Sequence, residues 1–428
     1  MGLSRAESSG SRQVALDLLD AVIGSRQALD AALAQHLGFA RLSQRDRAFA
    51  RLLAATALRR LGEIDATLKQ HLSRPLPQGA ARAMNALRLG AAQRLFLDTP
   101  PHAAVDTTVR LLDGRLSGFK GLANAVLRKL APAVERADAA RLNTPAWLWE
   151  SWSAAYSEPT AAAIAAAHLA EPPLDLSVAM DADGWRDRLE ATLLPTGSLR
   201  RPIGGDPSAL PGYDEGAWWV QDAAAALPAR LLRPVAGRRV IDLCAAPGGK
   251  TAQLAAAGAL VTAVDRSAAR LARLEANLKR LRLQAHVVAA DAETWRPDAP
   301  AEAILLDAPC TATGTIRRHP DIARIKTPAD VAAMAAVQDR LLRAAVDMAA
   351  PGGRIVYATC SLQPEEGPQR IAALLRDGAP ARLDRISATE MPGLSDAIGS
   401  DGTVRTLPCH WREAGGIDGF FIARLLRV

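Results

Sequence analysis

The fold of this chain is decided by one stretch, Val240-Ile241-Asp242-Leu243-Cys244-Ala245-Ala246-Pro247-Gly248-Gly249-Lys250-Thr251. Its apolar beginning predicts a short strand, and a loop of small residues with two glycines leads from it into a helical pattern at Thr251. Glycines let backbone N–H groups approach a ligand closely, and a helix N-terminus favours negative charge. The stretch therefore predicts the first strand–loop–helix turn of a nucleotide-binding α/β domain.

The residues around this stretch alternate between strand and helix patterns. We expect strands at 240–243, 260–265, 286–289, 303–307, 354–359, 404–407 and 420–425. Helices are expected to begin after Ser267 and after Thr327, where Pro328 and Asp330 complete a capping pattern. This alternation predicts a parallel, doubly wound, Rossmann-like sheet, with ligands at the carboxyl ends of its strands.

The first third of the chain has a different pattern. Apolar residues recur there at helical spacing without strand-like alternation, which predicts an all-α bundle over residues 1–140. Residues 144–216 contain short alternating segments and several turn signals, which predict a small α+β subdomain. We therefore expect three domains, at 1–140, 144–216 and 217–428, in a chain of 428 residues.

The charge of the chain points to a polyanionic partner. The net charge is +7, which suits nucleic acid but by itself also suits an anionic membrane surface. The helical region carries a basic cluster that is a candidate for RNA binding, although any one of its residues also fits an ordinary solvated face: Arg45, Arg47, Arg51, Arg59 and Arg60.

The number and spacing of the cysteines, together with the hydropathy of the chain, indicate the cellular compartment in which the protein works. The four cysteines form no C-x-x-C pair, so we expect neither a zinc site nor any other metal site. Four cysteines in so long a chain are no disulfide framework, which favours a reducing cytosol. No apolar run approaches ~18 residues and residues 1–13 contain no apolar signal segment, so we expect a cytoplasmic protein without a membrane span.

Polar residues and cysteines follow the expected strands. In nucleotide-binding folds of this kind, a carboxylate about 20 residues after the first strand binds a ribose hydroxyl, and Asp265 stands near that spacing. Asp291, after the next strand, is a candidate for binding the adenine edge. The next strand ends in Asp307-Ala308-Pro309-Cys310, and the following one in Thr359-Cys360-Ser361. One such Asp alone is often a helix cap, and one such Cys a small buried apolar residue. Their convergence on one sheet edge is hard to explain by packing.

Three of these runs carry a family resemblance. Asp242 to Lys250, Asp307 to Gly314 and Tyr357 to Ser361 resemble the RNA cytosine-5 methyltransferases of the Sun type. Residues 316–322 resemble the bacterial branch that modifies 16S ribosomal RNA, and residues 101–105 and 121–126 resemble the NusB-like RNA-binding domain of that branch. Residues 418–421 resemble the last strand of the family. The departures are Thr311 where Ser is usual, Ala358 in place of a frequent Ser, and Gly367 after Pro364-Glu365-Glu366 where Asn is common.

The resemblance implies an S-adenosylmethionine site and a two-cysteine centre. The cofactor would be held by Cys244, Ala245, Ala246, Pro247, Gly248, Gly249, Lys250, Asp265, Asp291 and Asp307. Cys360 would be the nucleophile, Cys310 would assist product release, and Asp307 would hydrogen-bond the activated base. Lys250 would lower a thiol pKa or orient a carboxylate. Arg317, Arg318 and His319 are candidates for RNA phosphate contacts, whereas the thiols of Cys244 and Cys409 are expected to be structural.

The chemistry of cytosine fits this set of residues. Its C5 is a poor nucleophile until a thiolate adds at C6. We therefore expect transfer of a methyl group from S-adenosylmethionine to C5 of a cytosine in 16S ribosomal RNA through a Cys–C6 adduct, by a monomer. The alternatives are the same chemistry on transfer RNA, a non-catalytic RNA-binding assembly factor, and a cofactor-dependent oxidoreductase. The last lacks support because the loop has no G-x-G-x-x-G spacing.

Overall fold

The computed structural model describes residues 7–131, 136–202 and 204–428. It divides into two compact units, of which the first spans Met1–Leu169 with Arg318–Lys326, and the second spans Ala170–Arg317 with Thr327–Val428. The division into three domains, at 1–140, 144–216 and 217–428, stays a prediction. None of the helices formed by the described residues is long and apolar enough to span a membrane.

The first unit is helical, which confirms the predicted all-α bundle. Its core consists almost entirely of Leu, Val, Ile and Ala from the apolar faces of the longer helices. The helices are α1 (Glu7–Leu19), α2 (Leu29–Gln35), α3 (Leu37–Ala40), α4 (Gln44–Arg59), α5 (Leu61–His71), α6 (Ala81–Leu95), α7 (Pro101–Arg110), α8 (Lys120–Lys129), α9 (Ala139–Asn143), α10 (Ala146–Tyr156), α11 (Glu158–Ala167) and α16 (Ile322–Ile325).

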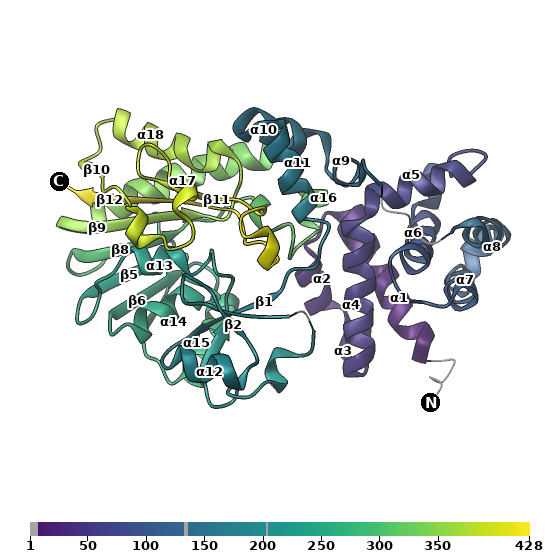
Figure 1. Ribbon diagram of the computed structural model, residues 1–428, viewed down its shortest axis with the longest axis horizontal. Helices are drawn as coiled ribbons and strands as arrows, with labels where there is room; N and C mark the ends of the chain where they lie inside the picture. Colours follow the sequence, from purple (N-terminus) through teal and green to yellow (C-terminus); the bar gives the residue numbers. More distant parts are fainter. Residues whose placement is uncertain (1–6, 132–135, 203) are drawn as a thin grey trace. The chain divides into compact units, whose positions relative to one another are not determined.

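Helix α16 reaches this unit from far along the chain, and Figure 1 shows it in green among the purple and blue helices. The backbone N–H of Leu29 donates to Asp321 Oδ2 at 2.9 Å, and Arg26 Nε donates to the carbonyl of Ile325 at 3.0 Å. Arg324 donates to the carbonyl of Asn143 at 2.8 Å. The segment 318–326 is thus hydrogen-bonded into the helical unit at several points.

The second unit begins with a small antiparallel sheet, which confirms the predicted α+β region. The strand order is β2–β3–β1–β4, and helix α12 packs on the sheet through Trp185. A buried ion pair joins two neighbouring strands, because Arg200 Nε lies 2.7 Å from Asp175 Oδ1. The elements are β1 (Leu174–Val178), α12 (Ala182–Arg188), β2 (Thr192–Leu193), β3 (Leu199–Arg201) and β4 (Trp218–Val220).

The large sheet of this unit has the order β10–β12–β9–β8–β5–β6–β7, with β11 paired to β12. Strands β5 to β9 are parallel neighbours, as predicted. The strands are β5 (Arg239–Leu243), β6 (Leu260–Asp265), β7 (His286–Ala289), β8 (Ala301–Asp307), β9 (Ala349–Thr359), β10 (Ala381–Leu383), β11 (Val404–Thr406) and β12 (Phe420–Arg427).

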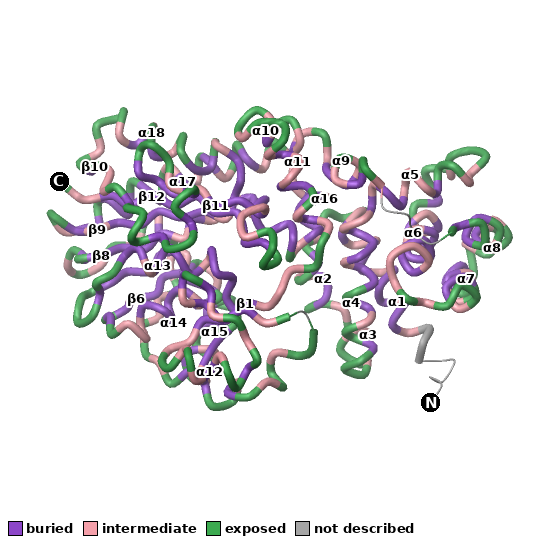
Figure 2. The backbone as a smooth tube through the Cα atoms, in the orientation of Figure 1, coloured by how far each residue is buried: buried purple, intermediate pink, exposed green. Residues whose placement is uncertain are grey.

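Helices cover both faces of this sheet. Val240 packs in the core that includes α13 and α14, whereas the next residue, Ile241, packs in the core formed with α17 and α18. This alternation is the period of a strand buried on both faces, and Figure 2 shows the strands of the sheet largely in the buried colour. The helices are α13 (Leu227–Leu231), α14 (Gly249–Ala256), α15 (Ala268–Leu281), α17 (Pro328–Met348) and α18 (Pro368–Arg376).

The end of the sheet departs from the predicted parallel arrangement. Strand β12 runs antiparallel to β9, β10 and β11. Antiparallel neighbours need no crossover helix, and only a loop with one 3₁₀ turn connects β11 to β12. Strand β10 was not predicted, because three residues give no periodic signal. The predicted caps are present: Arg270 N–H donates to Ser267 Oγ, and Thr327 N–H donates to Asp330 at 2.8 Å.

Candidate active site

The loop after β5 has the form that the sequence predicts. Gly248 caps α14 with φ +101°, and a Cβ built on it would lie 2.7 Å from Leu274 Cγ. Only glycine fits this left-handed position without strain and without a clash. The loop from Cys244 to Gly249 therefore consists of small residues, so a ligand can approach its backbone closely. It leads directly into the N-terminus of a helix.

Two buried carboxylates flank this loop. Asp242 is fully buried, its Oδ2 accepts a hydrogen bond from Thr251 Oγ1 at 2.6 Å, and its Oδ1 has no partner among the described residues. Burial raises the pKa of Asp242 to about 7. Asp265, at the end of β6, accepts from the N–H of Ala246 at 3.2 Å and of Ser267 at 2.9 Å. The free Asp242 oxygen and the glycine cradle fit a ligand that brings a cationic or N–H donor.

Asp291 follows β7 and is exposed. Its Oδ1 accepts a hydrogen bond from the N–H of Glu293 at 2.9 Å, so the side chain shapes the turn after the strand. Asp291 and Asp265 stand after neighbouring parallel strands of the sheet, with Asp265 paired in register to Ala289. Both predicted cofactor carboxylates therefore lie at one edge of the sheet.

Lys250 and Asp307 form an ion pair. Lys250 Nζ lies 2.6 Å from Asp307 Oδ2 and 5.3 Å from the centroid of the Phe420 ring. The lysine side chain is nearly buried, whereas that of Asp307 is about one-third exposed. Of the two roles left open for Lys250, this geometry favours orienting a carboxylate.

Cys310 and Cys360 meet although they are far apart in the sequence. Their strands β8 and β9 are parallel neighbours with Asp307 opposite Ala358, and the two sulfur atoms lie 3.4 Å apart. The hydrogen bond with Cys360 and burial raise the pKa of Cys310 well above that of a free thiol. These effects favour the protonated form of Cys310, whose sulfur lies beside that of Cys360.

The other two cysteines, Cys244 and Cys409, are partly buried. Burial raises the pKa of Cys244 to about 12, and burial also raises the pKa of Cys409. Both thiols are therefore protonated and unreactive near neutral pH. All four cysteines are free, and the described residues contain no cluster of three or more metal-ligating side chains.

The structure corrects the expectation of an RNA contact for Arg317. The Arg317 side chain is 1% exposed and is paired with two buried carboxylates, Asp222 and Asp418. Its Nε donates to Asp418 Oδ1 at 2.8 Å. A guanidinium so enclosed cannot reach a phosphate, so Arg317 ties two loops of the second unit together.

Arg317→Met should therefore lower the free energy of unfolding by about 3–5 kcal/mol, because it leaves two carboxylates buried without their cation. Chemical denaturation followed by tryptophan fluorescence measures this. Arg318→Met is the matched control, since Arg318 is exposed, and it should change the free energy by no more than about 0.5 kcal/mol. Equal stability of the two variants would contradict the role assigned to the ion pairs.

Arg318 and His319 belong to the first unit. Arg318 is exposed, and His319 Nδ1 lies 3.4 Å from Asp30 Oδ2. Of the basic cluster, Arg45, Arg47 and Arg51 on α4 are exposed, whereas Arg60, directly after α4, pairs with Glu63 at 2.9 Å. An RNA contact stays a prediction for the exposed members.

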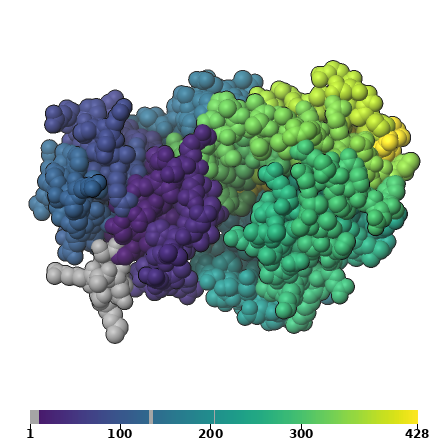
Figure 3. All heavy atoms as spheres, turned by 180° about the vertical axis from the view of Figure 1, so that it is seen from behind, coloured from purple at the N-terminus to yellow at the C-terminus, as the bar shows by residue number. Residues whose placement is uncertain are grey.

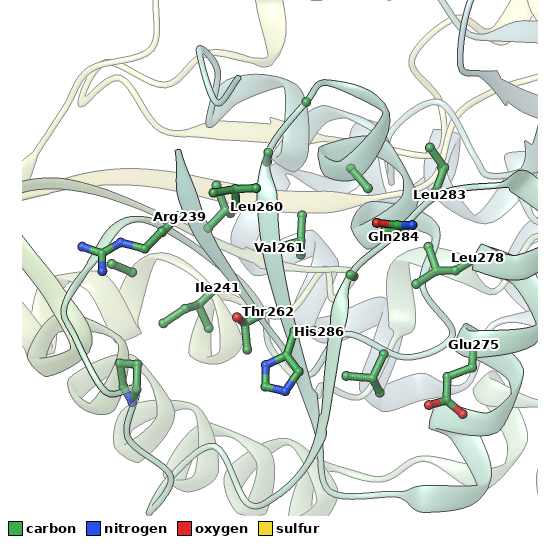
Figure 4. A pocket seen from close by; sticks show the side chains of 18 of the residues that line it. Arg239, Ile241, Leu260, Val261, Thr262, Glu275, Leu278, Leu283, Gln284 and His286 are labelled. Atoms are coloured by element: carbon green, nitrogen blue, oxygen red, sulfur yellow. The ribbon is translucent and has the colours of Figure 1, made fainter. Parts of the chain in front are cut away.

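A cavity of about 1260 Å³ lies elsewhere in the second unit, at the starts of β5, β6 and β7. Figure 4 shows Arg239, Leu260 and His286 among its lining residues, and none of the predicted site residues lines it. Residues from about 260 to 300, green in the space-filling view of Figure 3, form part of the surface of this unit. Ligands of doubly wound sheets bind at the carboxyl ends of the strands, so this cavity is not the candidate site.

Sequence reasoning missed Glu366, which is fully buried behind the two cysteines. Its carboxylate accepts hydrogen bonds from Thr311 and Ser361, the residues that directly follow Cys310 and Cys360. The signal in the sequence is the pair of acidic residues after Pro364, Glu365 and Glu366. A Cβ on the glycine that follows them, Gly367, would lie 2.8 Å from the Phe421 ring.

Comparison with known proteins identifies both parts of the chain. Residues 229–426 match the model of the 16S rRNA methyltransferase RsmB/F family, and residues 9–132 match that of the NusB family. The chain is 35% identical to ribosomal RNA small subunit methyltransferase B of Cronobacter sakazakii (97% of this chain, 98% of the relative). It is 37% identical to the protein of the same name from Pseudomonas putida, again over 97% of this chain and 98% of the relative.

Among solved structures, the crystal structure of PH0851 matches with a TM-score of 0.77 and 22% identity, over 99% of this chain and 100% of the other. This match shows the fold. The identity to the curated relatives extends over both the helical and the α/β parts, and the cysteine centre and the glycine loop lie within the matched range 229–426. The chain therefore belongs to the 16S rRNA methyltransferase RsmB/F family.

Proposed function

We propose that this protein transfers a methyl group from S-adenosylmethionine to C5 of a cytosine in 16S ribosomal RNA through a covalent adduct on Cys360. The observation that carries the proposal is the pair of thiols 3.4 Å apart at the ends of two parallel strands. Family membership supports the methyl transfer and the cofactor. A binding protein without catalysis needs no such pair, and neither does a hydride-transfer enzyme.

The residues around the glycine loop would hold the cofactor. Asp265 would bind the ribose hydroxyls, Asp291 would lie beside the adenine edge, and the carboxylates of Asp242 and Asp307 would face the cationic methionyl end. The loop from Cys244 to Lys250 would pass along it. When bound, the cofactor supplies an electrophilic methyl group on a sulfonium.

The chain's own residues would carry the remaining steps. The Cys360 thiolate adds to C6 of the cytosine, and the electron pair of the C5–C6 double bond makes C5 nucleophilic enough to take the methyl group. The C5 proton then passes to a base, the C6–S bond breaks, and the double bond is restored. Cys310 assists this release, while Asp307, oriented by Lys250, hydrogen-bonds the activated base.

The RNA substrate is proposed from the relatives and from the helical unit. Curated relatives that match nearly the whole chain are named ribosomal RNA small subunit methyltransferases. The NusB-like unit exposes Arg45, Arg47 and Arg51 on α4, which suits a polyanion. We infer that the protein acts in the cytoplasm as a monomer; analytical ultracentrifugation tests the latter.

Bisulfite sequencing of ribosomal and transfer RNA from a deletion strain tests the proposed function. We expect one cytosine of 16S ribosomal RNA to lose its protection from deamination, and purified protein with S-adenosylmethionine to restore it. Loss of protection confined to transfer RNA would show that transfer RNA is the substrate. Unchanged protection in both RNAs, with no methyl transfer in vitro, would refute the enzymatic function.

A further inference from the structure

One buried carboxylate connects the two loops that carry the cysteines. Glu366 is 0% exposed. Its Oε1 accepts hydrogen bonds from the backbone N–H of Thr311 at 2.8 Å and from Gln338 Nε2 at 3.1 Å, and its Oε2 accepts from the hydroxyls of Thr311 and Ser361. Because Thr311 follows Cys310 and Ser361 follows Cys360, each cysteine is one residue away from a group that Glu366 holds.

We propose that Glu366 is a positioning residue of the two-cysteine centre, whose buried carboxylate fixes Cys310 beside Cys360 by binding the residue that follows each of them. The proposal rests on the proposed function, since it concerns the same pair of thiols. Glu366 itself would contact neither RNA nor cofactor.

Glu366 is itself held rigidly. Its backbone carbonyl accepts a hydrogen bond from the hydroxyl of Tyr357, in β9, at 2.8 Å. Gln338, from α17, donates both to Glu366 and to the carbonyl of Pro309 at 2.8 Å, directly before Cys310. The Cys310 loop is thus bound on both sides of the cysteine. Direct contact between the loops, Gly314 N–H to the carbonyl of Cys360 at 2.9 Å, completes the connection.

A buried carboxylate is costly unless several donors satisfy it. The two donors on Oε1 are N–H groups and the two on Oε2 are hydroxyls, so both oxygens accept hydrogen bonds, as in an ionised carboxylate. Burial raises the pKa of Glu366, so keeping the carboxylate ionised lowers the stability of the fold. A charge here has a consequence for the thiols, because Cys360 and Glu366 both act to raise the pKa of Cys310. The carboxylate thus favours the protonated form of Cys310.

Glu366→Gln tests the proposal, because it keeps the shape but removes the charge and one acceptor. We expect kcat to fall by about 10- to 100-fold, with unchanged affinity for S-adenosylhomocysteine measured by calorimetry. The acidic limb of the pH–rate profile should shift to lower pH, since the thiol pair then ionises more easily. Glu365→Gln is the matched control: it removes the same charge at the neighbouring, exposed position and should keep both the rate and the profile.

Alkylation by iodoacetamide, followed by mass spectrometry, gives a readout without RNA. Cys310 should become reactive at a lower pH in Glu366→Gln than in the wild type, because the variant lacks the charge that helps to raise the Cys310 pKa. At a fixed pH, alkylation should therefore spread to Cys310 in the variant. If the wild type proves inactive on RNA, the proposed function fails while this comparison still tests Glu366. Identical alkylation and pH profiles for wild type and Glu366→Gln would overturn the role of Glu366 alone.

A second pair of variants applies if Glu366→Gln does not fold, as judged by circular dichroism. Thr311→Val removes the hydroxyl that donates to Glu366, and Thr311→Ser restores it. We expect the valine variant to have a kcat about 10-fold below that of the serine variant. Equal kcat values for these two variants would overturn the proposal.

Discussion

Cys360→Ala should abolish methyl transfer, with a loss of at least about 10³-fold in kcat, because no other group can add to C6 of the cytosine. The Cys310 thiol is the less suited nucleophile of the pair, because its pKa is raised well above that of a free thiol. The sulfur of Cys360 lies 3.4 Å from it. Transfer of the labelled methyl group from S-adenosylmethionine to 16S ribosomal RNA measures the rate.

The affinity for S-adenosylhomocysteine should be unchanged in Cys360→Ala, because none of the hydrogen bonds around Asp242 and Asp265 involves this residue. Cys409→Ala is the matched control: it removes a partly buried thiol with a raised pKa and should keep the rate. Turnover retained in Cys360→Ala would show that the nucleophile has been assigned to the wrong cysteine.

Cys310→Ala should trap the enzyme on its substrate. Cys360 can still add to the cytosine and the methyl group can still be transferred, but without Cys310 the C6–S bond breaks slowly. We expect a protein–RNA band that survives denaturing electrophoresis, together with multiple-turnover activity reduced by at least about 10²-fold. The methyl group should be found within this band.

The double variant Cys310→Ala/Cys360→Ala is the control, and it should form no band because it lacks the nucleophile. A band in the double variant would place the adduct on another residue. Normal turnover in Cys310→Ala, without a band, would show that Cys310 takes no part in product release. Its 3.4 Å contact with Cys360 would then be a packing contact only.

Much of the fold was predictable because its signals are local. The strand–loop–helix turn from Val240 to Thr251 lies in consecutive residues, and its glycine stands where a left-handed backbone needs one. The helical bundle follows from apolar spacing along each helix, and the parallel strands β5 to β9 from their alternation with helices. Strands β11 and β12 were predicted, but not their antiparallel orientation, because pairing direction depends on which distant strand lies beside them.

Sequence and tertiary structure contributed differently to the site. Local sequence patterns predicted which residues stand at the ends of strands or just after them, because the end of a strand is a local property. Asp265, Asp307, Cys310 and Cys360 are among these residues. Three further features depend on packing between distant segments. The thiols 50 residues apart in the chain meet, Arg317 is buried between two carboxylates, and Glu366 binds both cysteine loops. Contact, burial and pKa arise from neighbours distant in sequence, whereas strand ends and glycine turns are set by the residues next to them.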